Sequence, residues 1–182
     1  LIIAVKGVSP TLKKHLASFL HQKYPNYQLF FTVESQTDPA YSLIKKLISH
    51  YPHAQLVVSQ LSHSCSQKNQ NILTAIQKIN NPEILAFADA DITVAENWLS
   101  ELILPLSNPE ITATTSYYWP QLTHGSFGEL FFLFTNTNIF SLFCFSSSFL
   151  RFSLLWGGSI AIRHQTFKQL NIAKYWSHSV SD

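Results

Sequence analysis

The sequence predicts an α/β fold in which helices flank a mostly parallel central sheet. Short apolar runs alternate with segments whose apolar residues recur at helical spacing, which is the pattern of βαβ units. Ser9-Pro10 and Asp38-Pro39 each follow such a run, and a polar residue before proline favours a helix start. Residues 84–88 are apolar at every position, as expected of a strand buried on both faces.

The expected elements follow one another along the whole chain. Strands are expected at residues 1–5, 27–33, 55–58, 84–88 and 111–119. One helix is expected to begin at Ser9-Pro10, with Leu12, Leu16, Phe19 and Leu20 on its apolar face. Further helices are expected from Asp38-Pro39 to Ile48, over 68–79 and over 96–106. With no repeat and no linker, residues 1–182 form one expected domain. Because there is no Met and both ends interrupt a segment, we expect a fragment truncated at both ends.

The composition narrows the class of protein. Hydrophobic residues make up 46% of the chain and charged residues 12%, which is typical of a folded rather than a disordered chain. A net charge of +2 without a basic run predicts no nucleic-acid partner. Cys65 and Cys144 match neither a disulfide framework nor a zinc spacing, so we expect a reducing compartment.

Residues 130–150 form a phenylalanine-rich segment without charge. Threonine, asparagine and serine interrupt it, so it is more polar than the ~20 apolar residues that a bilayer-spanning helix needs. One interpretation is an interfacial helix or the wall of an apolar substrate groove. The other is a helix packed on the sheet.

Asp89 and Asp91 directly follow the strand expected at 84–88. The carboxyl ends of strands are where open α/β sheets bind ligands. On an extended segment, side chains at i and i+2 point the same way, and carboxylate oxygens suit Mg²⁺ or Mn²⁺. Such an ion would neutralise charge on a departing nucleoside diphosphate. The alternative is a strand-to-helix turn with solvated carboxylates.

Four further positions are candidate site residues. Lys6 precedes a glycine that permits close backbone approach. Asp38 is expected to cap a helix and is also placed to accept a hydrogen bond from a nucleobase. Lys68 begins a helix, where its charge is unfavourable, so an anion such as a diphosphate would hold it there; a solvated lysine is the alternative. Gly157-Gly158 predicts a sharp turn or a tight approach of a ligand.

Several ordered segments together resemble family 2-type glycosyltransferases, and most closely the ceramide glucosyltransferase and hopanoid biosynthesis-associated branch. The matching segments are Val5-Lys6-Gly7, Tyr24-Pro25-Asn26-Tyr27, Asp38-Pro39-Ala40, Lys68-Asn69-Gln70-Asn71, Asp89-Ala90-Asp91-Ile92 and Gly157-Gly158-Ser159-Ile160-Ala161-Ile162-Arg163. They cover nearly the whole chain in the family's order and spacing.

The resemblance implies a Rossmann-like GT-A fold and a metal-dependent enzyme. It implies transfer of a sugar from a UDP-sugar donor to a lipid acceptor hydroxyl with inversion, assisted by Mn²⁺ or Mg²⁺. It also implies membrane attachment through segments outside this chain, with the catalytic domain facing the cytoplasm. Other enzymes of the same fold, a polysaccharide synthase or a polyprenyl-phosphate glycosyltransferase, stay open, as does a catalytically silent GT-A binding domain.

Residue roles follow from the resemblance by position. Asp38 would contact the uridine, Lys6 and Lys68 the donor, and Asp91 the metal with Asp89 beside it. The acceptor-side segment would be formed by Gly157, Gly158, Ser159 and Arg163. The family's catalytic base is an aspartate in an acidic pair after this segment. Asp182 is therefore expected to be that base or the residue immediately before it.

Overall fold

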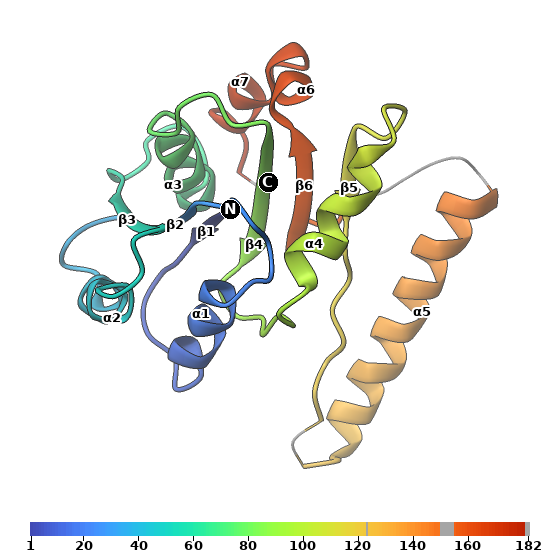
Figure 1. Cartoon of the computed structure of the whole chain (residues 1–182). Coiled ribbons are helices and arrows are strands. Elements are labelled where there is room, and N and C mark those ends of the chain that lie inside the picture. The colour runs from blue at the N-terminus through green and yellow to red at the C-terminus, as the bar shows by residue number, and fades with distance from the viewer. Residues whose placement is uncertain (123, 150–154, 181–182) are drawn as a thin grey trace.

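The computed structural model of the chain describes residues 1–122, 124–149 and 155–180 (Figure 1). Within them, six strands form one sheet in the order β3-β2-β1-β4-β6-β5. The strands are β1 (Ile2–Ala4), β2 (Leu29–Val33), β3 (Ala54–Val58), β4 (Ile84–Asp89), β5 (Ala113–Thr115) and β6 (Ser159–Arg163). β1 to β4 pair in parallel, and β6 runs antiparallel between β4 and β5. The α/β fold with a mostly parallel sheet is thus confirmed.

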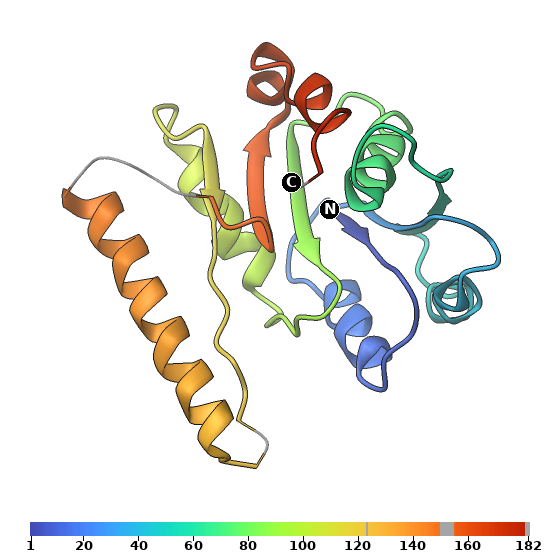
Figure 2. The ribbon, with the colours of Figure 1, turned by 180° about the vertical axis from the view of Figure 1, so that it is seen from behind.

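Helices cover both faces of the sheet, as Figures 1 and 2 show from opposite sides. The helices are α1 (Leu12–Leu20), α2 (Pro39–Leu47), α3 (Gln67–Ile76), α4 (Trp98–Ile103), α5 (Phe127–Phe149), α6 (His164–Gln169) and α7 (Ile172–Trp176). One face of the sheet packs on α1, α2 and α4, and the other on α3, α6 and α7. The side chain of β1 residue Ile3 belongs to the first face and that of Ile2 to the second, because successive strand residues alternate.

Helices α1 and α2 test the two expected helix starts, Ser9-Pro10 and Asp38-Pro39. Asp38 caps α2 as expected, since its Oδ1 accepts from the Ala40 N–H at 2.7 Å. The expected Ser9 cap is wrong: α1 begins at Leu12, and its N-cap residue Thr11 makes no side-chain cap bond. The expected apolar face of α1 is nevertheless buried, which indicates that core packing sets this helix.

Two expected elements are shorter than the sequence predicted. Helix α4 gives way to a 3-10 turn, η1 (Leu104–Ser107), because Pro105 lacks the N–H that an α-helix interior needs. Strand β5 pairs with β6 over only three residues, and the chain then leaves the sheet edge. The aromatic residues after β5 contact α5 instead. The short helices α6 and α7 were not predicted.

Helix α5 stands apart from the sheet, beside β5 (Figure 1). In the described residues, its segment Phe127–Ser146 is the one helical stretch of a length and composition that would permit a membrane crossing. Only 6% of that segment is buried. The expectation of a helix packed on the sheet is therefore wrong, because the helix contacts the segment after β5 and leaves most of its own surface exposed.

Candidate active site

The carboxyl ends of β1, β2, β3 and β4 lie along one edge of the sheet, because these strands are parallel. We call this the carboxyl edge. Strand β6 runs the other way, so its first residues arrive at the same edge. There the Asp89 N–H donates to the Gly158 carbonyl oxygen at 3.0 Å. The topology thus brings Asp89 next to the glycine segment 69 residues further along the chain.

Lys68 and Asp89 form an ion pair at the carboxyl edge. Lys68 Nζ lies 2.8 Å from Asp89 Oδ1, and each side chain is one-third exposed, at 33%. Lys68 sits in the first turn of α3, whose N-cap Ser66 accepts from the Asn69 N–H at 3.1 Å. The helix dipole disfavours a cation there, and the Asp89 carboxylate offsets this cost. The sequence predicted an anion such as a diphosphate beside Lys68, and in this structure the Asp89 carboxylate lies there.

Gly158 lies so close to Asp89 that no larger residue fits. A Cβ at this position would sit 2.7 Å from Asp89 Oδ2, and closer still to the Trp156 ring. The φ angle of Gly158 is not in the left-handed region, so space rather than backbone conformation requires glycine here. Gly158 therefore fixes the wall against which the Asp89 carboxylate rests.

Asp91 lies in a turn, since β4 ends at Asp89. The expected extended geometry across Asp89 and Asp91 is therefore not found. Asp91 is exposed and lines a cavity of about 480 Å³, together with Trp98, Tyr117, Trp156 and nearby residues. One carboxylate thus faces the Lys68 side of the edge, and the other faces an aromatic cavity.

Carboxylates are the oxygen ligands that a divalent-cation site of the open kind uses, although Asp89 and Asp91 face different sides of the edge in this structure. Mg²⁺ and Mn²⁺ sites use one or two carboxylates and complete their coordination with water and substrate phosphates. In the part of the chain that the structure describes, no group of three or more His, Cys, Asp and Glu side chains gathers. An ion held by Asp89 and Asp91 would consequently depend on the phosphates of a bound donor.

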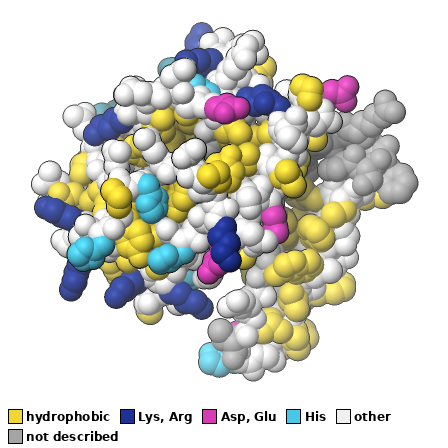
Figure 3. Space-filling model, in the orientation of Figure 1, with side chains coloured by type: hydrophobic (Ala, Val, Ile, Leu, Met, Phe, Trp, Pro, Cys, Tyr) yellow, Lys and Arg dark blue, Asp and Glu magenta, His cyan; other side chains and the backbone are white. Residues whose placement is uncertain are grey.

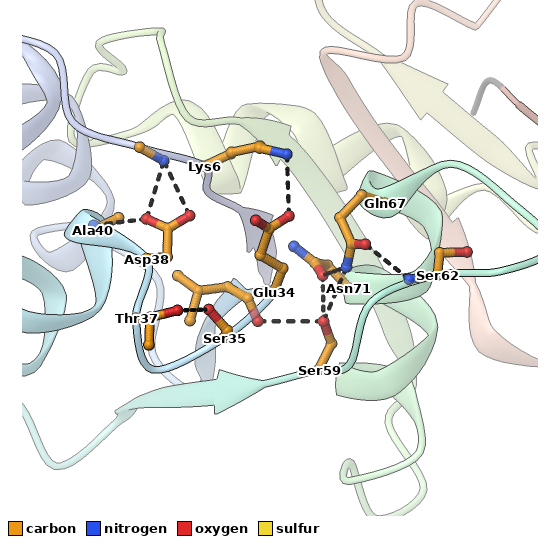
Figure 4. Close-up of polar contacts among 12 residues, drawn as sticks. Lys6, Glu34, Ser35, Thr37, Asp38, Ala40, Ser59, Ser62, Gln67 and Asn71 are labelled. Atoms are coloured by element: carbon orange, nitrogen blue, oxygen red, sulfur yellow. Dashed lines mark hydrogen bonds and ion pairs between the residues drawn. The ribbon is translucent and has the colours of Figure 1, made fainter.

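Asp38 lies under the loop that follows β1 (Figure 4). Gly7 adopts a left-handed φ of 65° and donates its N–H to Asp38 Oδ1 and Oδ2 at 3.1 and 3.2 Å. Asp38 is only 8% exposed, and its two oxygens are already engaged by the Ala40 and Gly7 N–H groups, which confirms its cap role.

Lys6 forms an ion pair with Glu34, with Nζ 3.1 Å from Oε2. The Lys6 side chain is 73% exposed, so its Nζ can turn toward solvent.

A buried amide and hydroxyl network links β3 to α3 (Figure 4). Ser59, directly after β3, donates to Asn71 Oδ1, and Gln67 Nε2 donates to the same oxygen at 2.8 Å. The Gln67 Oε1 atom in turn accepts from the Ser62 N–H at 2.9 Å. This network holds the start of α3, and hence Lys68, in place. Sequence reasoning missed it, although the Lys68-to-Asn71 segment marked the region.

The last described residues are tied to the same helix start. The carbonyl oxygen of Ser179 accepts from the Ser66 N–H at 2.9 Å and from Asn69 Nδ2 at 3.4 Å. Ser66 and Asn69 flank Lys68 in sequence, so the chain reaches the Lys68 side of the carboxyl edge three residues before Asp182. Asp182 itself lies outside the described residues.

The start of β6 is fastened to the end of β5 by hydroxyls. Thr115 Oγ1 accepts from the Trp156 N–H at 3.0 Å and lies 2.7 Å from the Ser159 carbonyl oxygen. Ser159 is buried, and its Oγ lies 2.6 Å from Ser116 Oγ. The predicted glycine turn is therefore clamped from β5. Nothing local in the sequence pointed to Thr115 or Ser116.

Arg163 is not brought together with the other candidates. It pairs with Ile84 at the start of β4, at the edge opposite Asp89. Its guanidinium donates to the Leu106 carbonyl and, at 3.1 Å, to the Asn108 carbonyl. These contacts stabilise the turn after η1. A second cavity, of about 450 Å³, also lies at this opposite edge, away from both carboxylates.

Comparisons with known proteins agree with this arrangement. The sequence profile of glycosyl transferase family 21 matches residues 2–171. A ceramide glucosyltransferase of Komagataella phaffii is 37% identical over 49 residues, which are 27% of this chain and 10% of that protein. The chain thus spans a small part of this curated relative.

Solved glycosyltransferases have the same fold. The mannosyltransferase of Pyrobaculum calidifontis, in complex with GDP-Man and Mn²⁺, matches 100% of this chain and 53% of its own, with a TM-score of 0.66 and 16% identity. TarS of S. aureus with UDP-GlcNAc matches 94% and 46%, with a TM-score of 0.58 and 14% identity. These similarities confirm the expected Rossmann-like GT-A fold. The chain spans about half the length of each.

Proposed function

The chain belongs to glycosyl transferase family 21, and we propose that it transfers a sugar from a UDP-sugar donor to the hydroxyl of a lipid acceptor, with inversion. The sugar transfer itself accords with the family. The proposals for a lipid acceptor and a membrane enzyme facing the cytoplasm draw on the short similarity to ceramide glucosyltransferase. The observation that carries the donor side is the meeting of Lys68, Asp89 and Gly158 at the carboxyl edge.

Donor binding follows from the charges at this edge. The Lys68 side chain is one-third exposed, and its ammonium is within reach of an anion that approaches Asp89. A diphosphate bound there would draw Lys68 from the carboxylate and leave Asp89 free for a cation. Mn²⁺ or Mg²⁺ at Asp89 and Asp91 would supply charge neutralisation for the departing UDP. Asp38 and the Gly7 loop would form the floor beneath the uridine, with Lys6 at its rim.

The acceptor side is the cavity beyond Asp91. Its aromatic walls, Tyr117, Trp119 and Trp156, suit the apolar part of a lipid and a sugar ring. We propose a single displacement in which the acceptor oxygen bonds to the anomeric carbon as the bond to the UDP phosphate oxygen breaks. The acceptor proton passes to a carboxylate at Asp182 or at the residue after it. Gly157, Gly158 and Ser159 hold the wall between donor and acceptor.

The test is a transfer assay with Asp91→Ala in the full-length protein, using labelled UDP-sugars, Mn²⁺ and dispersed lipid acceptors. We expect the product to fall by at least ~100-fold, as when a group that stabilises the leaving charge is lost. Glu110→Ala is the matched control, because Glu110 is also an exposed acid but is remote from the carboxyl edge. Unchanged turnover by Asp91→Ala would contradict the assignment, provided that its unfolding temperature matches wild type.

A further inference from the structure

Helix α5 exposes apolar side chains on the side that faces away from the sheet. The exposed fractions reach 62% for Phe131, 65% for Phe134 and 61% for Leu142. We call the set Leu130, Phe131, Phe134, Leu142 and Phe145 the outer face of α5. Hydrophobic side chains gather along this helix in the space-filling view (Figure 3). No charged residue occurs between Glu129 and Arg151, so the outer face is both apolar and uncharged.

The polarity of α5 is the reverse of that of a helix in a water-soluble domain. Its buried residues on the described part are Asn136 and Ser146, at 6% and 5% exposure. Tyr117 donates its hydroxyl to Asn136 Oδ1 at 3.1 Å, and burial raises the pKa of Tyr117, which keeps this phenol protonated as a donor. The Tyr117–Asn136 hydrogen bond and the ring contacts of Phe140 and Phe143 therefore hold the helix to the domain, while the outer face points away from it.

Four further polar side chains among the described residues of α5 donate within the helix itself. Each bonds to a backbone carbonyl one turn earlier on the same helix. The pairs are Thr135 with Phe131, Thr137 with Leu133, Asn138 with Phe134 and Ser141 with Thr137, at 2.7 to 2.9 Å. Such bonds lower the cost of placing hydroxyls and amides in an apolar medium. By composition α5 is polar for a membrane helix, but these four side chains leave few hydrogen-bond donors that still need a partner.

The shape of the apolar surface favours a continuous medium over a second helix. Exposed apolar residues run from Leu130 through Phe131 and Ile139 to Phe132 around α5. At 100° per residue they cover roughly 200° of the circumference, far more than the narrow seam of a helix pair. A second copy would cover only part of this surface. An uncharged hydrocarbon layer matches both its width and its lack of charge.

The topology favours an in-plane arrangement of α5 over a membrane crossing. The helix leaves from β5 and returns to β6, and these strands pair with each other. Trp156 also lies against Tyr118, with ring centroids 4.9 Å apart, so both connections meet at one place. A crossing would require one of the two connections, residues 116–126 or those between Phe149 and Trp156, to pass through a core of ~30 Å as non-helical backbone with unpaired N–H and C=O groups.

We propose that α5 lies in the plane of a lipid bilayer surface, with its outer face among the acyl chains. Where the proposed function holds, this deepens it, because Phe140 and Phe143 of α5 contact Tyr117 in the wall of the cavity beside Asp91. An acceptor with an apolar tail would then enter the cavity directly from the bilayer. Docking itself requires neither donor nor acceptor.

The first test is flotation of the purified chain with phosphatidylcholine vesicles, without donor or acceptor. Phe131→Ser, Phe134→Ser and Leu142→Ser together are expected to weaken vesicle binding by at least ~10-fold. The control replaces Leu61, Leu104 and Leu170 with Ser, which are equally exposed, at 63%, 69% and 58%, on the rest of the domain. The control is expected to bind as wild type does.

UDP binding in the presence of Mn²⁺ is measured on the same variants, and its affinity is expected to equal that of wild type. A loss of vesicle binding without a loss of UDP binding separates membrane docking from donor binding. Equal vesicle binding by both triple variants would overturn the inference. The inference would also be overturned if the wild-type chain does not bind vesicles but forms dimers in sedimentation velocity, and the α5 substitutions dissociate these dimers.

The second test measures depth. Phe134 and Phe145 both belong to the outer face of α5, about 20° apart around the helix and three turns apart along it. Each is replaced in turn by cysteine in a Cys65→Ser, Cys144→Ser background and labelled with the same fluorophore. Quenching by lipids brominated at shallow and deep positions is expected to give the same depth for both labels, because the helix lies flat. A depth difference of about half the bilayer core, ~15 Å, would overturn the in-plane arrangement.

Discussion

Replacing Gly158 with alanine tests the wall that supports Asp89. The new Cβ would lie 2.7 Å from Asp89 Oδ2, whereas ordinary contacts begin at 3.4 Å, so the carboxylate must move by roughly 0.7 Å. The Trp156 ring must also shift, since it is closer still. A displacement of this size in a positioned group costs on the order of 100-fold in rate. Overpacking should also lower the free energy of unfolding by about 1–3 kcal/mol.

The assay compares sugar transfer and chemical unfolding for Gly158→Ala and a matched variant, Gly128→Ala. Gly128 lies in α5, and a Cβ there would meet nothing within 4 Å. We expect Gly128→Ala to retain full transfer and to gain about 0.5–1 kcal/mol of stability, because alanine is the better helix former. A folded Gly158→Ala variant that transfers sugar as fast as wild type would show that Gly158 does not fix the Asp89 carboxylate.

Three further substitutions test individual contacts. Lys68→Met should weaken UDP binding by ~10-fold, because a partly buried charge contact to phosphate is lost, whereas Lys45→Met, at an exposed position, should leave UDP binding unchanged. Equal UDP affinities of the two variants in calorimetry would contradict the donor role of Lys68. Asp38→Ala should lower the free energy of unfolding by ~1 kcal/mol or more through loss of the α2 cap, and Asp38→Asn by less; equal losses in urea titrations would argue against capping. Arg163→Met should lower the melting temperature and leave UDP affinity intact, because its contacts lie at the opposite edge; a selective loss of affinity would place it in the site.

Much of the fold was predictable because strand and helix periods are local signals. The apolar run at 84–88 gave β4, and Asp38-Pro39 gave both a helix start and its cap. Local signals also produced the errors. Residues 111–119 are rich in β-branched and aromatic side chains, yet only Ala113–Thr115 pair as a strand, because Tyr117 and Trp119 pack on α5 instead of extending along β6. Pro105 was inside an apolar helical pattern, and its missing N–H turned the end of that helix into a 3-10 turn.

For the candidate site, the sequence predicted only which residues lie at the ends of strands, and not which of them are in contact. Asp89 and Gly158 could be assigned to a ligand edge from their positions, but their contact depends on β6 running antiparallel beside β4. The Lys68–Asp89 pair and the clamp by Thr115 join residues 21 and 41 positions apart, and no sequence period reports such contacts. Arg163 belonged to the matching segment, yet a five-residue strand separates it from the carboxyl edge.

We propose that Asp89 and Asp91 form a cation-dependent site for the UDP part of a donor. It is tested most directly by calorimetric titration of UDP into the chain, with Mn²⁺ and with EDTA, for wild type and Asp91→Asn. We predict that Mn²⁺ strengthens UDP binding to wild type by at least ~10-fold and that Asp91→Asn loses this gain. A wild-type UDP affinity that is the same with and without Mn²⁺, or no UDP binding by wild type under either condition, would show that the two aspartates hold no such cation.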